Sequence, residues 1–235
     1  MGKIKQWAQL GLLAIAGVGA ILFPSTAGWT GTPKFTEQIR NILQLEPPAD
    51  EGEGGSRGDA SELICPISPT GEQDESLNFF GPEPIWSDRP LFFWQLKSEK
   101  LTIREVRILR DDTDAVVWKA AVAPGQTSMV YPDDAPALEP GVAYYWQLMT
   151  RSPQVQGSFQ VLEQSEREDI GETLQALEEE LATEGIIPSE IALARALYFA
   201  QEDLLADMLQ SIYSIEDSSE DLQSLQDDLV RELCN

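Results

Sequence analysis

The chain has 235 residues, of which 40 are acidic and 16 basic, so its net charge at pH 7 is −24. This charge repels nucleic acid and anionic lipid, and it therefore disfavours both as partners. The sequence holds no histidine and two cysteines, which excludes Ser–His and Cys–His nucleophile systems and cysteine clusters for zinc or iron–sulfur. Neither a G-x-G-x-x-G motif nor a G-x-x-x-x-G-K-[ST] phosphate loop occurs.

The first residues have the pattern of a secretory signal peptide. Lys3 and Lys5 precede an apolar run from Ala8 to Phe23, and Ser25-Thr26-Ala27 follows with small residues. We expect cleavage after Ala27, so that residues 1–27 are removed and the mature protein resides in the periplasm or another exported compartment, free of the membrane. The alternative is an uncleaved anchor, although the run is shorter than the roughly 20 residues that span a bilayer.

Residues 28–62 are expected to form a short helix and a linker. Apolar residues recur at helical spacing within Pro33–Leu45, which predicts an amphipathic helix. The segment Glu46–Asp59 is acidic, rich in Pro and Gly, and nearly devoid of large apolar side chains, which is typical of a flexible tether. It includes Arg57-Gly58-Asp59, an adhesion tripeptide that arises easily in a glycine-rich linker and that predicts no adhesion here.

Residues 63–163 have the pattern of an Ig-like β-sandwich. Short segments rich in aromatic and β-branched residues alternate with turn residues, a spacing that favours a sandwich over an α/β fold. The predicted strands contain Trp86, Leu91–Trp94, Ile103–Leu109, Ala115–Val122, Ser128–Tyr131, Ala143–Met149 and Gly157–Leu162.

A corner of the sandwich is marked by Leu138, Pro140, Gly141 and Tyr144, which form the pattern L-x-P-G-x-x-Y. The Pro-Gly pair turns the chain, and Tyr144 opens the next strand, from which its hydroxyl can reach a backbone group upstream. This motif indicates architecture only, because sandwiches host many unrelated functions.

Residues 164–235 are predicted to form a small helical unit, because the apolar period changes here from two to about 3.6. Ser165 and Glu168 have the spacing of a capping box at the start of the first helix. Gly185 is expected to end this helix, and Pro188 to open the next one.

Two further helices follow from the apolar stripes within Leu204–Ile212 and Leu222–Leu233. Ser218 or Ser219 is expected to cap the last helix, since a serine hydroxyl can accept a hydrogen bond from a free backbone amide there.

Cys65 lies near the start of the predicted sandwich, and Cys234 lies one residue from the end of the chain. An even cysteine count in an exported protein predicts a disulfide between them. In the chain-entropy model, closing so long a loop contributes about 4–5 kcal/mol. Two free thiols are the alternative if the compartment is reducing.

The segment Asp88–Trp94, then Val117-Trp118 and the corner at Leu138–Trp146, resembles an immunoglobulin- or fibronectin-III-like domain. With the following segment Ile191–Tyr198, this order resembles uncharacterised exported proteins of cyanobacteria. The resemblance covers about Cys65 to the C-terminus. It implies a β-sandwich plus a small C-terminal α-helical unit, and it implies no activity.

We therefore expect an exported, non-catalytic module that binds another protein and has no cofactor, catalytic residue or metal ligand of its own. The candidate partner surface contains Tyr198, Phe199, Leu205 and Met208, because the apolar stripe here is broader than one helix–helix seam needs. In the alternative, the sandwich itself covers the apolar residues of this stripe that another helix leaves uncovered.

Two other functions stay open at this point: a carbohydrate- or calcium-binding module of the cell envelope, and a carboxylate-dependent hydrolase. The acidic turn Asp111–Asp114 offers oxygen ligands for calcium, or it is a solvated hairpin turn. Glycosidases use two carboxylates at a fixed distance, but 40 acidic residues single out no pair.

A sugar-binding platform would need exposed aromatic side chains. Strand alternation places Trp94, Tyr144 and Trp146 in the core, where sandwich tryptophans normally lie. It leaves Tyr145 on the outer face, next to Phe93 if their strands are neighbours.

Overall fold

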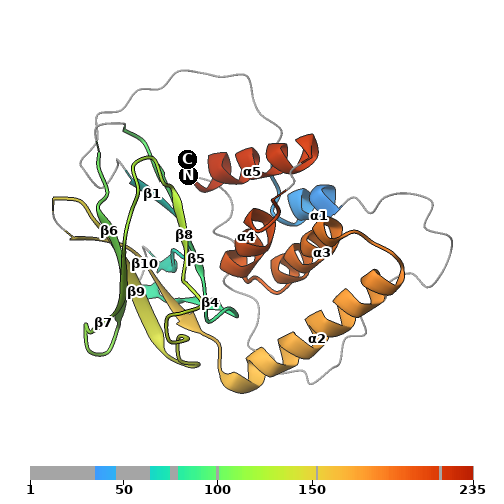
Figure 1. Ribbon diagram of the computed structural model, residues 1–235, viewed down its shortest axis with the longest axis horizontal. Helices are drawn as coiled ribbons and strands as arrows, with labels where there is room; N and C mark the ends of the chain where they lie inside the picture. The colour runs from blue at the N-terminus through green and yellow to red at the C-terminus, as the bar shows by residue number, and fades with distance from the viewer. Residues whose placement is uncertain are drawn as a thin grey trace.

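The computed structural model describes residues 35–45, 64–74, 79–98, 101–151, 153–216 and 219–234, which form two β-sheets with helices on one side (Figure 1). The predicted signal peptide, the linker at 46–59 and its Arg57-Gly58-Asp59 tripeptide lie outside these residues. In chain order the elements are α1 (Phe35–Ile42), β1 (Ile64–Ser68), β2 (Glu72–Asp74), β3 (Phe79–Gly81), β4 (Glu83–Ile85), β5 (Leu91–Leu96), β6 (Glu105–Arg110), β7 (Val116–Ala121), β8 (Ser128–Val130), β9 (Ala143–Met149), β10 (Pro153–Val161), α2 (Gln164–Thr183), α3 (Pro188–Gln201), α4 (Leu205–Tyr213) and α5 (Glu220–Leu233).

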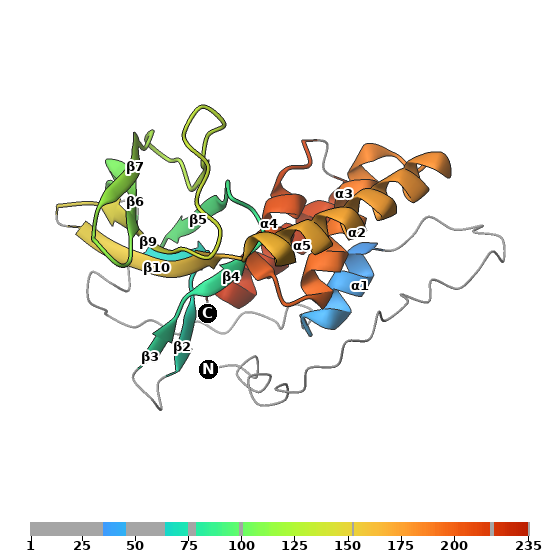
Figure 2. The ribbon, with the colours of Figure 1, turned by 90° about the horizontal axis from the view of Figure 1, so that it is seen from below.

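The strands of the described chain form two main sheets and a separate β2–β3 hairpin, which projects away from both sheets (Figure 2). The three-stranded sheet has the order β1-β5-β8, and the five-stranded sheet has the order β4-β10-β9-β6-β7. All pairings are antiparallel except that of β10 with β4. The predicted strands from Leu91–Trp94 onward have counterparts in β5 to β10, although β10 begins at Pro153 rather than at Gly157. Trp86 follows β4 instead of lying in it, and β1, β2 and β3 had not been predicted as strands.

A closed core lies between the two main sheets. The ring of Trp146 lies 5.2 Å from that of Phe92 and 6.2 Å from that of Trp94, and Phe159 lies 5.9 Å from Phe92. All four side chains are fully buried, and Tyr144 joins them. The predicted alternation in β5 and β9 is therefore confirmed.

The helices cover the opposite face of the three-stranded sheet. Leu91 and Phe93 of β5 point to this side, where the ring of Phe93 lies 4.7 Å from that of Tyr213 in α4. Burial on both faces explains why β5 is a continuous apolar run instead of an alternating one. Tyr145 was expected beside Phe93 only if their strands were neighbours. The two strands, β9 and β5, lie in different sheets, so this pair does not form.

The predicted N-terminal helix, α1, belongs to the helical layer. Phe35 and Ile39 are buried in the same core as α3, α4 and α5. The guanidinium of Arg40 forms an ion pair with Asp228 of α5 and donates a hydrogen bond to the Ser224 hydroxyl (3.0 Å). A segment remote in sequence thus completes the packing of α3 and α5.

The predicted capping box of α2 is wrong by two residues. The helix begins at Gln164, and the backbone N–H of Glu163 donates to the carboxylate of Glu166 (3.2 Å). Ser165 and Glu168 therefore lie inside the first turns of the helix. The shift arises because β10 ends at Val161 and the chain turns into the helix at once.

The boundary residues predicted for α2, α3 and α5 are found, whereas α1 ends at Ile42 instead of Leu45. Gly185 follows α2 with φ of +79°, Pro188 opens α3, and the Ser219 hydroxyl accepts a hydrogen bond from the N–H of Leu222 (3.2 Å) at the start of α5. None of the helices within the described ranges combines the length and the apolarity that a membrane span requires.

The predicted corner before β9 is formed. The backbone N–H of Glu139 donates to the hydroxyl of Tyr144 (3.0 Å), while Leu138 is buried. After Pro140, Gly141 has φ of +73°, a conformation that favours glycine. A Cβ at this position would lie 2.6 Å from the carboxylate of Glu163, an exposed side chain that can move away, so the positive φ is what requires glycine here.

The predicted disulfide is also present. Cys65 in β1 and Cys234 after α5 are joined, with their Cα atoms 5.7 Å apart, which is within the range that a disulfide spans. The bond connects the three-stranded sheet with the last helix. The ammonium group of Lys97 donates to the carbonyl oxygen of Cys234 (2.9 Å) at the same place.

Candidate functional site at the junction of sheets and helices

The four residues expected to form a partner surface lie mostly in the core. Tyr198, Phe199 and Met208 are 8%, 1% and 0% exposed, and Leu205 is half-buried. The broad apolar stripe of α4 is covered by α3 on one side and by β1, β4 and β5 on the other. The alternative interpretation of the stripe, in which the sheets cover it, therefore describes the structure.

The acidic turn between β6 and β7 uses its carboxylates within the protein. Asp112 accepts from the guanidinium of Arg110 (3.2 Å), which holds the pKa of that carboxyl below its ordinary value. Asp114 accepts from the hydroxyl of Tyr145 (2.6 Å). In the part of the chain that the structure describes, no group of three or more Asp, Glu, Cys or His side chains lies where it could hold a metal ion.

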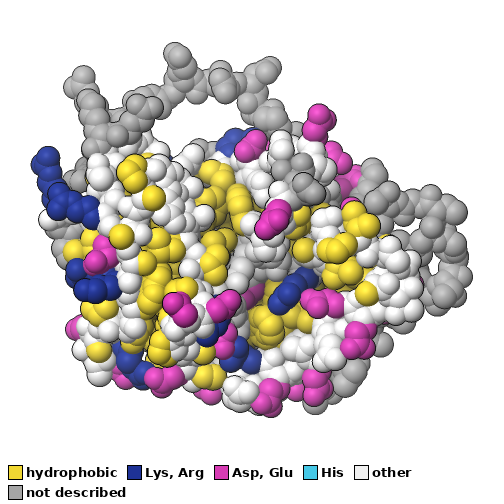
Figure 3. All heavy atoms as spheres, viewed as in Figure 1, with side chains coloured by type: hydrophobic (Ala, Val, Ile, Leu, Met, Phe, Trp, Pro, Cys, Tyr) yellow, Lys and Arg dark blue, Asp and Glu magenta, His cyan; other side chains and the backbone are white. Residues whose placement is uncertain are grey.

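A pocket of about 370 Å³ lies where the sheets meet the helices. It is lined by Trp86 and Ser87 of the β4–β5 connection, by Glu178 of α2, and by facing sides of α3 and α4. Figure 3 shows hydrophobic side chains gathered between the sheets and the helices, with charged side chains among them. Concave sites with apolar walls and a few polar groups are where ligands and partner side chains usually bind.

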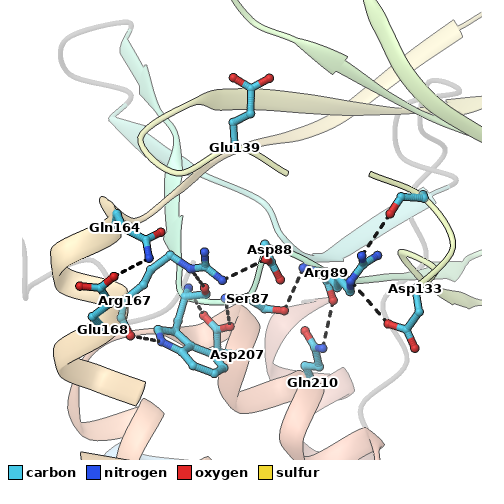
Figure 4. Close-up of polar contacts among 12 residues, drawn as sticks. Ser87, Asp88, Arg89, Asp133, Glu139, Gln164, Arg167, Glu168, Asp207 and Gln210 are labelled. Carbon is cyan, nitrogen blue, oxygen red and sulfur yellow. Dashed lines mark hydrogen bonds and ion pairs between the residues drawn. The ribbon is translucent and has the colours of Figure 1, made fainter. Parts of the chain in front are cut away.

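Trp86 forms one wall of the pocket and is held from two sides. Its indole N–H donates to the carbonyl oxygen of Arg167 in α2 (3.0 Å), and the Arg167 guanidinium donates back to the carbonyl oxygen of Trp86 (2.8 Å). Arg167 also forms an ion pair with Asp88 (3.2 Å), so that the connection is anchored to α2 at successive residues (Figure 4). These contacts fix the orientation of the indole ring.

Arg195 of α3 lies over the pocket side of Trp86. Its guanidinium carbon is 5.5 Å from the centre of the indole ring and 6.0 Å from that of Phe199, distances at which a cation is attracted to an aromatic face. Glu178 approaches the same guanidinium at 3.4 Å. The Nε atom of Arg195 is shielded from solvent and has no hydrogen-bond partner within the described residues.

Two buried carboxylates fasten α4 to the β4–β5 connection in reciprocal fashion. Asp207 of α4 accepts from the backbone N–H groups of Trp86 (2.7 Å) and Ser87 (2.8 Å), as Figure 4 shows. Glu83 of β4 accepts from the N–H of Ala206 (3.1 Å) in the first turn of α4, where amides are free of intrahelical partners. Thus α4 supplies the acceptor for two backbone amides after β4, and β4 supplies the acceptor for a backbone amide at the start of α4.

Burial sets the electrostatics of these carboxylates. Loss of solvation raises the pKa of Asp207 to about 7, against the opposing effect of the two amide hydrogen bonds. Burial also raises the pKa of Glu83, although the amides of Thr70, Gly71 and Ala206 favour its charged form. The two carboxylates repel each other as well, so neither is held in its charged form without cost.

The remaining aromatic candidates do not form a second binding platform. Trp94, Tyr144 and Trp146 lie in the core between the sheets. Tyr145 faces outward and is engaged with Asp114. Trp118 packs against Tyr131, with ring centroids 5.3 Å apart.

A second hollow, of about 740 Å³, lies between α5 and the end of β5, next to Cys234. Its charged lining residues are Lys97, Asp227 and Arg231, which are all exposed. Lys97 donates to the carbonyl oxygen of Cys234 and Arg231 pairs with Asp228, so both cations are already engaged within the protein.

Sequence reasoning missed Trp86, Arg195 and Asp207 as site residues. A signal was present in the two helices, because Arg195 is the one cation in α3 and Asp207 interrupts the apolar stripe of α4. A single charge within an apolar helix face indicates a buried partner or a site. The indole of Trp86 could not be distinguished from a core tryptophan, since only the fold places α2 and α3 against it.

Comparison of the chain with protein-family models, with curated proteins and with solved structures finds no match. Any function must therefore be argued from the junction pocket and its chemistry.

Proposed function

We propose that this is an exported, non-catalytic interaction protein that binds another protein at the junction pocket. The observation that carries the proposal is the fixed Trp86–Arg195 pair in a concave site between sheets and helices. Tryptophan and arginine are enriched among residues that dominate binding energy at interfaces, above all where they occupy well-packed pockets. A partner side chain entering the pocket would meet the Arg195 guanidinium and the exposed part of Trp86.

An immunoglobulin- or fibronectin-III-like fold is part of the proposal. If β1, β5 and β8 are taken as strands A, B and E, then β6, β9 and β10 correspond to C, F and G, with β7 as C′. The hydroxyl contact of Tyr144 with the backbone of Glu139, at the start of β9, supports the same assignment, since a tyrosine corner opens strand F. Such sandwiches commonly serve as binding scaffolds.

The pocket favours binding over hydrolysis because its carboxylates are already employed. Both oxygens of Asp207 accept backbone amides, and Glu178 lies beside Arg195. A general acid–base pair would need carboxylate oxygens directed at a substrate. Sugar stacking has less support as well, because the Arg195 guanidinium covers the Trp86 ring that would serve as a platform.

Export is proposed from the pattern of residues 1–27 and is supported by the Cys65–Cys234 disulfide, because structural disulfides persist in oxidising compartments.

The proposal is tested by filling the pocket. Ala192 lines it and is half-exposed, whereas Ala121 is exposed on β7, away from the pocket. Ala192→Tyr should abolish capture of the partner from an envelope extract of the source cells, and the matched Ala121→Tyr should not. Circular dichroism melting of both variants checks that the fold is kept. Equal capture by wild type and both variants would contradict the assignment of the pocket.

A further inference from the structure

We infer that the segment received by the junction pocket is basic and amphipathic, an inference that rests on the function proposed for this pocket. Residues 164–235 contain 19 acidic and 3 basic residues, a net charge of −16. The sandwich region 63–163 contains 14 acidic and 8 basic residues, a net charge of −6. The helical layer, which forms most of the pocket, thus carries most of the negative charge of the chain.

Within the pocket, Glu178 is the carboxylate that a partner can reach. It lies beside the guanidinium of Arg195, whereas Asp207 is 3% exposed and has both oxygens on backbone amides. An acidic segment would have to displace Glu178 from Arg195 and would be repelled by that carboxylate. A lysine or arginine would instead meet Glu178 at the edge of the pocket, where that side chain is 39% exposed.

An exposed row of carboxylates on α2 extends the acidic edge. Glu168, Glu172 and Glu179 are exposed, and helical spacing places them in one row beside the row that contains Glu178. Glu168 and Glu179 accept hydrogen bonds from the neutral side chains of Gln164 and Gln175, contacts that leave their charges uncompensated. Figure 3 shows acidic side chains spaced along this helix.

The floor of the pocket supplies the apolar half of the recognition. Trp86, Ile191 and Ala192 are partly exposed and present aromatic and aliphatic surface to the hollow, whereas Phe199 also lines it but is 1% exposed. A segment laid over the pocket can insert apolar side chains into it and keep its charged side chains at the rim. The partner that fits is therefore a protein segment with apolar residues on one face and lysine or arginine beside them.

Selection from a random, displayed 12-residue peptide library tests the inference on the full chain. Peptides are selected on wild type and counter-selected on Ala192→Tyr, which blocks the pocket. We expect the pocket-dependent peptides to combine apolar residues with a net positive charge, and to bind more weakly as salt is raised. Glu178→Gln should weaken their binding by about threefold, the effect of one partly exposed charge pair, while the matched Asp111→Asn should not.

Different results would contradict the basic character of the bound segment and the assignment of the pocket as a binding site. Pocket-dependent peptides that are neutral or acidic, or that bind independently of salt and of Glu178, would overturn the basic segment and leave the pocket as a binding site. Recovery of no peptide, or only of peptides that bind Ala192→Tyr as well as wild type, would overturn the pocket and the inference together.

Discussion

The pH dependence of stability should reveal the buried carboxylate of Asp207. This side chain accepts hydrogen bonds from Trp86 and Ser87, and Asp207 is 3% exposed, so burial raises its pKa from an ordinary 3.8 to about 7. A group with a higher pKa in the folded chain than in the unfolded chain binds its proton more tightly in the folded state. Its contribution to stability is present at low pH and is lost as the pH rises through about 7.

The size of the effect follows from the two pKa values. Between pH 8 and pH 5, a carboxyl with a pKa of about 7 in the fold and 3.8 in the unfolded chain contributes about 2.5 kcal/mol to the unfolding free energy on acidification. Asp207→Asn removes this term. Glu83, whose pKa burial also raises, is present in both proteins, so its effect largely cancels in their difference.

Urea unfolding of wild type and Asp207→Asn, followed by far-UV circular dichroism at pH 5, 6, 7 and 8, measures the difference. When the pH is lowered from 8 to 5, the unfolding free energy of wild type should rise by about 2.5 kcal/mol more than that of the variant. Asp112→Asn is the matched control, because Asp112 is exposed and Arg110 lowers its pKa. The contribution of the Asp112 carboxylate to stability is lost only below pH 5. The pH profile of Asp112→Asn should therefore be parallel to that of wild type.

Parallel pH profiles of wild type and Asp207→Asn would refute the reasoning, since Asp207 would then carry the same charge from pH 5 to pH 8. A profile in which wild type loses stability relative to the variant on acidification would also refute it, because the sign would be that of a carboxylate stabilised in its charged form.

Four further outcomes are expected. Trp146→Ala should cost about 3–5 kcal/mol of unfolding free energy because its ring is fully buried, and a loss below about 1 kcal/mol would mean that the core tolerates its removal. Tyr144→Phe should cost about 1 kcal/mol in the same urea assay by removing the corner hydrogen bond, and no change would show that the contact is dispensable. Joint replacement of Cys65 and Cys234 by serine should cost about 4–5 kcal/mol, and thiol reductants should then have no further effect on the melting temperature. Intact mass of the exported protein should place its N-terminus at Gly28, whereas full-length protein in the soluble cytosol would contradict export.

Local patterns were sufficient for β5 to β10, for most helix ends and for the corner, but they did not predict β1, β2 or β3. Alternation in β9 places Tyr144 and Trp146 on one face because side-chain direction in a strand has a period of two, whatever the strand packs against. Gly141 and Gly185 mark turns because their positive φ is a local steric property. The cap of α2 is the exception, since a glutamate occupies the position for which serine was expected.

The disulfide was also predictable, because two cysteines in a chain predicted to be exported leave one intramolecular pairing. No local pattern indicated that α1 packs between α3 and α5, or that the ion pair of Arg40 with Asp228 connects segments so far apart. The disulfide and the contacts of α1 are both long-range. Composition constrains only the disulfide, because the chain has just two cysteines.

The site depended on tertiary structure entirely. Phe93 could be a surface residue by alternation, but the helices bury it because they need the outer face of the three-stranded sheet to cover the stripe of α4. The same packing brings Trp86, Arg195 and Asp207 from three elements to one pocket. Sequence determines which side chains each element can present on a face, whereas the meeting of those faces, and hence the burial and the pKa of Asp207, is decided by how the helices dock on the sheets.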